Sequence, residues 1–312
     1  MAKTAKNAAK YILPLYMNGL SGRMIKMPPP RGKRREILLI SGQHTSIERI
    51  YGLAEYLNRF GGVTSPDLPG LGGMTSFYKI GEKPTLDNMA DYLATFIKLR
   101  YKKNRRFTLI AVSYGFAVAT RMLQRYPELA SRVDLLISLS GVTHKADFKW
   151  KKHNYYLLYG ASWLFSRRVP AYVAKTTCIR APVIRGLYRI AEAKHPKLKD
   201  AKQAERAKRI NFEIKLWKAN DFRTWTYSCV SLFRLDLTKR HADLPVYHVS
   251  VDDDHYFSQV QVESHMRRIF KDFELVPTKL PAHAPTVLAT PKDVEPFIPP
   301  KIRVLLRRQP RK

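Results

Sequence analysis

The chain has few cysteines, few acidic residues and no long hydrophobic run. Among its 312 residues the only cysteines are Cys178 and Cys229, which excludes a disulfide framework and a four-cysteine zinc site. No apolar segment reaches the roughly 18–20 residues that a membrane-spanning helix needs. Hydrophobic residues nevertheless make up 45% of the chain, which is enough for the core of one large domain with an insertion.

The shortage of acidic residues leaves a formal net charge of +31, and this charge is unevenly placed. Residues 1–35 contain nine bases and no acids, residues 144–240 contain 23 bases and seven acids, and residues 301–312 contain six bases and no acids. The remaining segments are close to neutral. Basic segments attract anionic lipid, nucleic acid or acidic substrates, but a solubilising surface without a partner explains the same composition.

Strands and helices are predicted to alternate on both sides of the basic middle segment. The first part has strands at 36–40, 62–65, 107–112 and 133–139 and helices at 47–60, 86–99 and 115–125. The same order returns at 245–251, 262–269 and 273–276. Short apolar runs that alternate with helical periodicity predict a mainly parallel sheet with helices on both faces.

The alternation stops in the middle segment, which is rich in aromatic and basic residues and too long for a loop. It is interpreted as a helical cap inserted into the sheet domain. The predicted organisation is a basic N-terminal arm at 1–35, an α/β core at 36–143 and 241–300, a helical basic and aromatic cap at 144–240, and a basic C-terminal tail at 301–312.

One serine stands at a predicted junction between a strand and a helix. Ser113 follows the apolar run that ends at Val112, with Ala111 two residues before it and Gly115 two residues after it. A serine in a sharp strand–turn–helix connection needs small residues at both of these positions, because its backbone is strained. The context therefore predicts a nucleophilic serine at the nucleophile elbow.

Several further motifs in the same order resemble the α/β-hydrolase superfamily, in its serine-nucleophile branch related to esterases and lipases. They are Leu38-Leu-Ile-Ser-Gly-Gln-His, Pro66-Asp-Leu-Pro-Gly-Leu-Gly, the turn at 125–133, the strand and acidic turn Pro245 to Asp254, and Pro281-Ala-His-Ala-Pro. The resemblance covers roughly residues 36–143 and 241–298. It implies an α/β-hydrolase fold, whose catalytic residues follow the chain order Ser, acid, His.

By this resemblance the catalytic residues are Ser113, Asp254 and His283, with Asp253 as an alternative acid. His283 takes the proton of the serine, and the aspartate orients the histidine. The backbone N–H groups of Gln43 and Tyr114 are expected to form the oxyanion hole. No metal is expected, although the run of three aspartates at 252–254 leaves a cation site or a solvated turn as alternatives.

Two features around these residues leave more than one interpretation. His44 would either line the pocket or lie exposed in its loop. The cap aromatics would either form the core of the cap or face the active site as an apolar acyl pocket. The resemblance also implies that serine at position 113 disfavours the haloalkane dehalogenase and epoxide hydrolase branches, which use aspartate there.

The resulting hypothesis is a serine hydrolase that needs no cofactor and cleaves a carboxylic ester with an apolar acyl part. The alternatives are a thioesterase or acyltransferase on the same fold, and a non-catalytic hydrolase-like protein that binds anionic lipid or nucleic acid. The expected partner is a small ester or lipid-like substrate. A cytoplasmic location, with peripheral contact to anionic membranes, fits the charge, whereas no nucleic-acid module is recognised. The sequence does not determine the oligomeric state.

Overall fold

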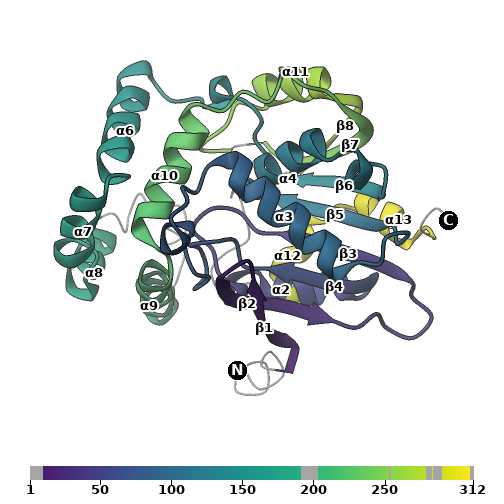
Figure 1. Ribbon diagram of the computed structural model, residues 1–312, viewed down its shortest axis with the longest axis horizontal. Coiled ribbons are helices and arrows are strands. Elements are labelled where there is room, and N and C mark those ends of the chain that lie inside the picture. The colour runs from purple at the N-terminus through teal and green to yellow at the C-terminus, as the bar shows by residue number, and fades with distance from the viewer. Residues whose placement is uncertain (1–9, 191–202, 253, 279–282, 284–289, 310–312) are drawn as a thin grey trace.

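The protein is built around one eight-stranded sheet, whose strands follow one another from the top of Figure 1 to the bottom. The computed structural model describes residues 10–190, 203–252, 254–278, 283 and 290–309. The strands are β1 Ile12–Met17, β2 Leu20–Met27, β3 Arg35–Ile40, β4 Gly61–Pro66, β5 Phe107–Val112, β6 Val133–Leu139, β7 Ala242–Val251 and β8 Phe270–Thr278. Their order is β1-β2-β4-β3-β5-β6-β7-β8, and every neighbouring pair from β4 to β8 is parallel.

Helices cover both faces of the sheet. The main ones are α2 Ile47–Asn58, α3 Leu86–Arg100, α4 Tyr114–Arg125, α11 Gln259–Ile269 and α13 Pro300–Arg307, with the short helices α5 Pro127–Ala130 and α12 Pro291–Val294 and the 3-10 turns Phe77–Ile80, Lys145–Asp147 and Glu295–Phe297. One hydrophobic cluster joins the sheet to α3, α4 and α11, and a second joins it to α2, α12 and α13. Strands such as β5 are buried on both sides, as expected for a sheet between two helical layers. The predicted fold class is confirmed.

The N-terminal segment differs from the arm expected at 1–35. Strands β1 and β2 form an antiparallel hairpin, and β2 pairs with β4 at the edge of the sheet. Leu15 and Met17 of β1 and Met24 and Ile25 of β2 are almost fully buried. The buried residues of β1 alternate, whereas Met24 and Ile25 of β2 are adjacent and pack in two different clusters, and bases such as Arg23 remain partly exposed. Residues 12–27 are therefore part of the sheet domain, and the expected arm is wrong for them.

The expected C-terminal tail is likewise wrong for the residues of α13. Ile302 and Leu306 are buried in the second hydrophobic cluster. The guanidinium of Arg35 donates hydrogen bonds to the carbonyl oxygens of Leu306 and Arg308 at 3.0 and 2.6 Å. A short amphipathic helix with bases on its outer side looks like a charged tail in sequence, but in this fold it closes one face of the core.

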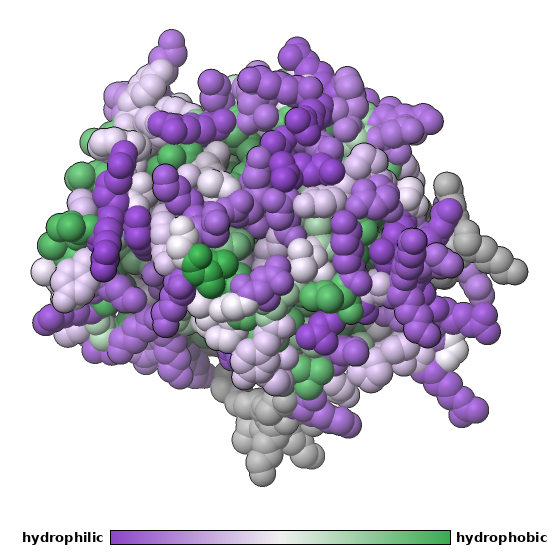
Figure 2. Space-filling model, viewed as in Figure 1, coloured by the Kyte–Doolittle hydropathy of each residue, from purple (hydrophilic) through white to green (hydrophobic). Residues whose placement is uncertain are grey.

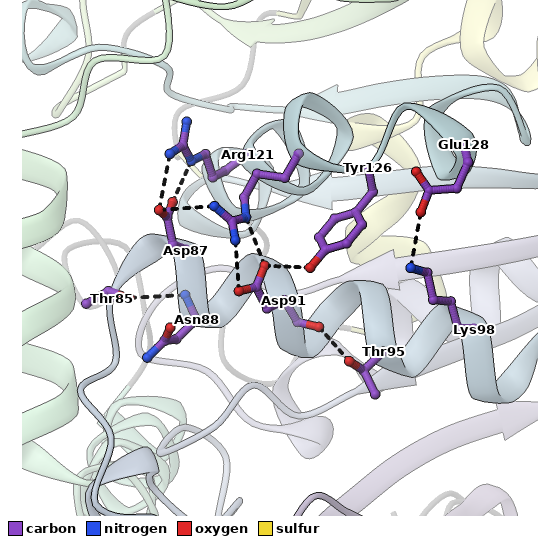
Figure 3. A network of polar contacts seen from close by, with 10 residues as sticks. Thr85, Asp87, Asn88, Asp91, Thr95, Lys98, Arg121, Tyr126 and Glu128 are labelled. Carbon is purple, nitrogen blue, oxygen red and sulfur yellow. Dashed lines mark hydrogen bonds and ion pairs between the residues drawn. The ribbon is translucent and has the colours of Figure 1, made fainter.

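A polar seam joins α3 to α4, the helix that begins directly after Ser113 (Figure 3). Arg121 Nε lies 2.5 Å from Asp87 Oδ1, and Arg125 Nε lies 2.9 Å from Asp91 Oδ1. The hydroxyl of Tyr126 donates to the same carboxylate of Asp91 at 2.8 Å. Exposed ion pairs of this kind each contribute little stability, but they join the facing sides of α3 and α4.

The inserted segment forms helices α6 Lys152–Phe165, α7 Arg168–Thr177, α8 Ala181–Ile190, α9 Gln203–Ala219 and α10 Phe222–Phe233. In Figure 1, α6, α7 and α8 stand at one edge of the molecule, and α10 lies between them and the sheet domain. Part of the aromatic content forms a small cap core, in which Phe165, Trp217 and Trp225 pack around Phe222. None of the helices in the described ranges is long and apolar enough to span a bilayer.

Candidate active site

Ser113 occupies the turn between β5 and α4 with a strained backbone. Its φ angle is 49° and its ψ angle is −121°, which a residue with a side chain adopts only under local constraint. A side chain at Gly115 would collide with the carbonyl oxygen of Ser41, so the first turn of α4 can approach β3 only because this residue is glycine. The turn presents the Ser113 hydroxyl beyond the carboxyl end of β5.

The imidazole of His283 faces that hydroxyl. His283 Nε2 lies 2.9 Å from Ser113 Oγ, although the two residues are 170 positions apart. The rings of Tyr256 and Phe257 stand edge-on to the imidazole, each with its centroid 5.3 Å away. These two rings limit the orientations that the imidazole can adopt and shield one side of it from water.

Asp254 holds the opposite side of the same ring. Its Oδ2 lies 2.5 Å from His283 Nδ1, and its Oδ1 accepts hydrogen bonds from the backbone N–H groups of Tyr256 and Phe257. Burial alone would raise the pKa of Asp254, but the hydrogen bond and charge of His283, with the two N–H donors, keep this pKa below its ordinary value. An ionised Asp254 places the imidazole proton on Nδ1 and leaves Nε2 free to accept the proton of Ser113.

Asp254 and Asp252 of the acidic run have different surroundings. Asp254 is 1% exposed and turned into the site, whereas Asp252 is exposed. Asp253, the alternative acid, lies outside the described residues. In the part of the chain that the structure describes, no three His, Cys, Asp or Glu side chains are grouped as a metal site requires. The carboxylate of Asp254 is also already occupied by two N–H groups and an imidazole.

The loop after β3 passes beside the serine. A β-carbon on Gly42 would lie 3.3 Å from Ser113 Cβ, so this loop is in van der Waals contact with the nucleophile elbow. Tyr114 is the first residue of α4, where backbone N–H groups have no acceptor within the helix. Of the positions expected to supply oxyanion donors, Tyr114 directly follows Ser113, and Gln43 directly follows Gly42, which lies beside it.

The side chain of Gln43 ties its loop to the cap, and the sequence did not reveal this contact. Gln43 Nε2 donates to the carbonyl oxygen of Trp225 at 3.0 Å and to Ser228 Oγ at 2.7 Å, both on α10. The thiol of Cys229 lies 3.0 Å from the same nitrogen. Burial raises the pKa of this thiol to about 11, so Cys229 is a neutral group and no competing nucleophile.

His44 does not lie free in its loop, because it contacts the cap. Its Nε2 lies 3.1 Å from Glu213 Oε2 on α9, and its ring packs against Trp217 with centroids 4.2 Å apart. The histidine therefore ties the loop after β3 to the cap. The partners Glu213 and Trp217 belong to the insertion, where no sequence spacing relates them to position 44.

Comparison with known proteins agrees with the fold. A family model described as the alpha/beta hydrolase fold matches residues 37–279. No curated protein matches the chain. Many solved structures do match it, and three of them are 12–14% identical to it in sequence, which supports the fold alone.

The names of these three proteins give three different activities. A bacterial membrane phospholipase A has a TM-score of 0.65 at 14% identity over 97% of this chain and 91% of its own. An epoxide hydrolase from Bacillus megaterium has a TM-score of 0.64 at 12% identity, with 94% and 98% covered. An enol-lactonase from Burkholderia xenovorans has a TM-score of 0.61 at 14% identity, with 94% and 99% covered.

Proposed function

The chain belongs to the α/β-hydrolase family, and from this premise we propose that it is a serine hydrolase that cleaves a carboxylic ester with an apolar acyl part. The observation that carries the proposal is the continuous contact from Ser113 Oγ through His283 to Asp254, with separations of 2.9 and 2.5 Å. The first distance is in the range that a nucleophile and its general base need, and the second is a short contact between the base and the acid that orients it.

The chemistry follows from the protonation states. His283 Nε2 removes the Ser113 proton while Ser113 Oγ attacks the carbonyl carbon of the ester. The tetrahedral intermediate collapses when the alkoxide leaves with a proton from His283, and the acyl group remains bonded to Ser113. Water then attacks the acyl carbon with His283 again acting as base, which releases the acid and restores the serine. Asp254 stays ionised throughout and stabilises the positive imidazole.

The developing negative charge on the carbonyl oxygen needs donors near Ser113. Backbone N–H groups of Tyr114 and Gln43 are proposed for this role, because both residues adjoin the serine and such donors are fixed before the reaction starts. The side-chain hydrogen bonds from Gln43 to α10 hold its loop in place. The cap therefore has a structural connection to the group that would bind the oxyanion.

An apolar acyl part is supported by the side chains around the site. Tyr256 and Phe257 flank His283, and Trp225 stands where α10 meets the Gln43 loop. None of these side chains carries a charge that would favour a charged acyl group. The fold similarity to an epoxide hydrolase does not extend to the reaction, because the proposed nucleophile of this chain is a serine.

Experiment can separate the two alternatives from this proposal. A thioesterase or acyltransferase would form the same acyl-serine but accept a thioester donor or an acceptor other than water. A non-catalytic protein would bind without forming the acyl-serine. Ester and thioester substrates and added alcohol acceptors, offered to the same preparation, distinguish an esterase from a thioesterase or an acyltransferase. Covalent labelling distinguishes all three enzymes from a non-catalytic protein.

The test is reaction with a serine-directed fluorophosphonate, followed by turnover of p-nitrophenyl esters of increasing chain length. Ser113→Ala should abolish labelling and reduce turnover to the residual rate that binding and oxyanion donors alone provide. Ser140→Ala is the matched control, because Ser140 has the same positive φ of 49° but lies at the end of the neighbouring strand. Labelling that survives Ser113→Ala would reject the proposal.

A further inference from the structure

The cap exposes an unusual amount of apolar surface. Of the eighteen large hydrophobic side chains that are exposed in the described residues, eleven lie between Tyr156 and Ile190. Trp163 is 44% exposed and Leu157 is 70% exposed. In Figure 2, hydrophobic atoms alternate with hydrophilic ones along the edge where Figure 1 places α6, α7 and α8. Apolar groups gathered in this way mark an interaction surface more often than a solvated one.

These residues form stripes on the outer side of each helix. On α6, positions 156, 157, 160, 163 and 164 fall within one third of the helix circumference at 100° per residue. The opposite side of α6 faces the rest of the protein, where the Tyr155 hydroxyl donates to the carbonyl oxygen of Phe233. We define the outer cap face as Tyr156, Leu157, Trp163 and Leu164 of α6, Val169, Tyr172 and Val173 of α7, and Val183, Leu187 and Ile190 of α8.

The charge of the same segment has a single sign. Residues 148–190 contain nine Lys and Arg residues and no Asp or Glu. Lys152, at the start of α6, precedes the apolar stripe, and Arg167, between α6 and α7, follows it; both are exposed. The guanidinium of Arg167 lies 4.5 Å from the centroid of the Trp163 ring. The apolar stripe is therefore bordered by positive charge at both ends.

We propose that the outer cap face docks on the surface of an anionic lipid bilayer. Helices with an apolar side and basic borders lie in the interface between headgroups and acyl chains. Trp and Tyr are favoured at that depth, because an apolar ring and a polar N–H or O–H are both satisfied there. Nine bases without an acid provide the complementary charge for anionic headgroups.

Other occupants satisfy only part of these observations. A second copy of the chain, docked face to face, would bring two acid-free basic segments together and gain repulsion. A nucleic acid would pair with the bases but leave the leucine and valine side chains of α6, α7 and α8 in water. A bilayer matches the apolar stripes and the charge at the same time.

Helix α6, which carries part of the outer cap face, is connected to the candidate site by contacts between aromatic rings. Tyr155, on the inner side of α6, packs edge-on against Phe233 with centroids 5.0 Å apart. Phe148 contacts Phe233 at 5.3 Å and Phe257 at 5.0 Å, and Phe257 adjoins His283. A series of ring contacts through Tyr155, Phe233, Phe148 and Phe257 thus joins α6 to His283. The docking proposal itself rests on the surface and is independent of the hydrolase activity.

The test is co-sedimentation of the full chain with vesicles of phosphatidylcholine alone and of equimolar phosphatidylcholine and phosphatidylglycerol. The wild type should bind the anionic vesicles at least about tenfold more tightly, with affinity that falls as salt is added. Leu157→Glu should weaken binding by about tenfold or more, because it removes an inserted side chain and adds a repelled charge. Leu99→Glu is the matched control, since Leu99 is 65% exposed on α3 and outside the cap.

A second pair of variants separates local from overall charge. Lys151→Gln with Lys152→Gln removes two exposed bases beside the apolar stripe, and Lys102→Gln with Lys103→Gln removes two exposed bases elsewhere. At about fivefold per base near the membrane surface, the first pair should lose roughly 25-fold in affinity and the second pair much less. Thermal unfolding checks that each variant is folded.

Three results would overturn the proposal. One is equal binding to neutral and anionic vesicles. Another is an equal loss of vesicle affinity in the cap variants and in their controls. The third is a dimer, measured by sedimentation without vesicles, that Leu157→Glu dissociates, because the outer cap face would then be the interface between two copies.

Discussion

The Oδ2 atom of Asp254 meets Nδ1 of His283 at 2.5 Å, while the other oxygen of this carboxylate is held by two backbone N–H groups of its own turn. The turn therefore orients the carboxylate, and the carboxylate orients the imidazole. Because the pKa of Asp254 lies below its ordinary value, its carboxylate is ionised, as the proposed reaction needs.

Asp254→Asn should lower kcat for a soluble ester by about 10⁴-fold, since the amide stabilises the wrong tautomer of His283. Asp252→Asn is the control, because Asp252 is exposed and adjoins the same turn. Asp253→Asn tests the alternative acid by the same assay. A larger loss from the change at 253 than from that at 254 would reassign the acid.

The sequence predicted the parts of the site that depend on local order. A strand, a sharp turn and a helix place Ser113, and the carboxyl ends of parallel strands meet at one edge, so residues far apart in the chain converge there. The contacts of Gln43 and His44 with the cap could not be predicted, because no periodicity relates a core loop to helices about 170–185 positions away.

The two ends were misinterpreted for a different reason. Lysine and arginine dominate their composition, and this charge hides a few well-spaced apolar residues such as Leu15 and Met17 in β1 and Ile302 and Leu306 in α13. A strand at a sheet edge and a two-turn helix need only such a minimal apolar side, since their other side faces water. Net charge is therefore a poor guide to whether a segment is packed.

Gly115→Ala should lower both stability and turnover. The new β-carbon collides with the carbonyl oxygen of Ser41, so the turn that carries Ser113 must shift, at a cost of roughly 1–3 kcal/mol in the free energy of unfolding. Gly186→Ala in α8 is the control, since no atom lies within 4 Å of its β-carbon position and alanine favours a helix by about 1 kcal/mol. Thermal unfolding should therefore show a lower stability for Gly115→Ala and a higher one for Gly186→Ala. Ester turnover should fall in Gly115→Ala alone.

Ester turnover should not depend on divalent ions. The acidic run at 252–254 is the feature of the sequence that suggests a cation, but Asp254 already binds His283 and two N–H groups. Dialysis against a chelator should leave kcat unchanged within error. Activity that is lost to the chelator and restored by one metal would show instead that this turn binds a cation.

Stability should fall in acid because of His248, a buried residue of β7. Burial lowers its pKa to about 4 from the ordinary 6.5, and its Nδ1 lies 2.9 Å from Ser138 Oγ. Between these two values the unfolded chain binds more protons than the folded one, so stability is full above about pH 6.5 and is lost as the pH falls toward 4. The loss from this residue is about 3 kcal/mol.

Urea unfolding at several pH values measures this contribution. His248→Gln removes the titrating group. The difference in the free energy of unfolding between wild type and variant therefore cancels the contributions of the other groups that titrate. One of these is Asp67, whose pKa is raised by burial and whose effect has the opposite sign. Parallel pH curves for the two proteins would contradict the assignment.

Shortening the basic C-terminus should distinguish a solvated tail from a packed helix. Deletion of residues 303–312 removes Leu306, which is 1% exposed, and the three carbonyl oxygens that accept hydrogen bonds from Arg35. Loss of a buried leucine alone costs about 2–5 kcal/mol. The partly desolvated Arg35 would keep only Asp134 and Thr108 as partners among these contacts, so the truncated protein should unfold at a markedly lower temperature.

Deletion of residues 309–312 is the matched comparison. It removes Arg311 and Lys312 but leaves α13 and the partners of Arg35 intact, so stability should change by less than about 0.5 kcal/mol. Leu306→Ala and Val304→Ala repeat the comparison inside the helix, because Val304 is 49% exposed. If both truncations unfold at the wild-type temperature, α13 contributes nothing to the core. If only the deletion of 303–312 lowers stability, the positive charge of this end belongs to a structural helix. Removing that helix to test membrane attraction would then also destabilise the protein.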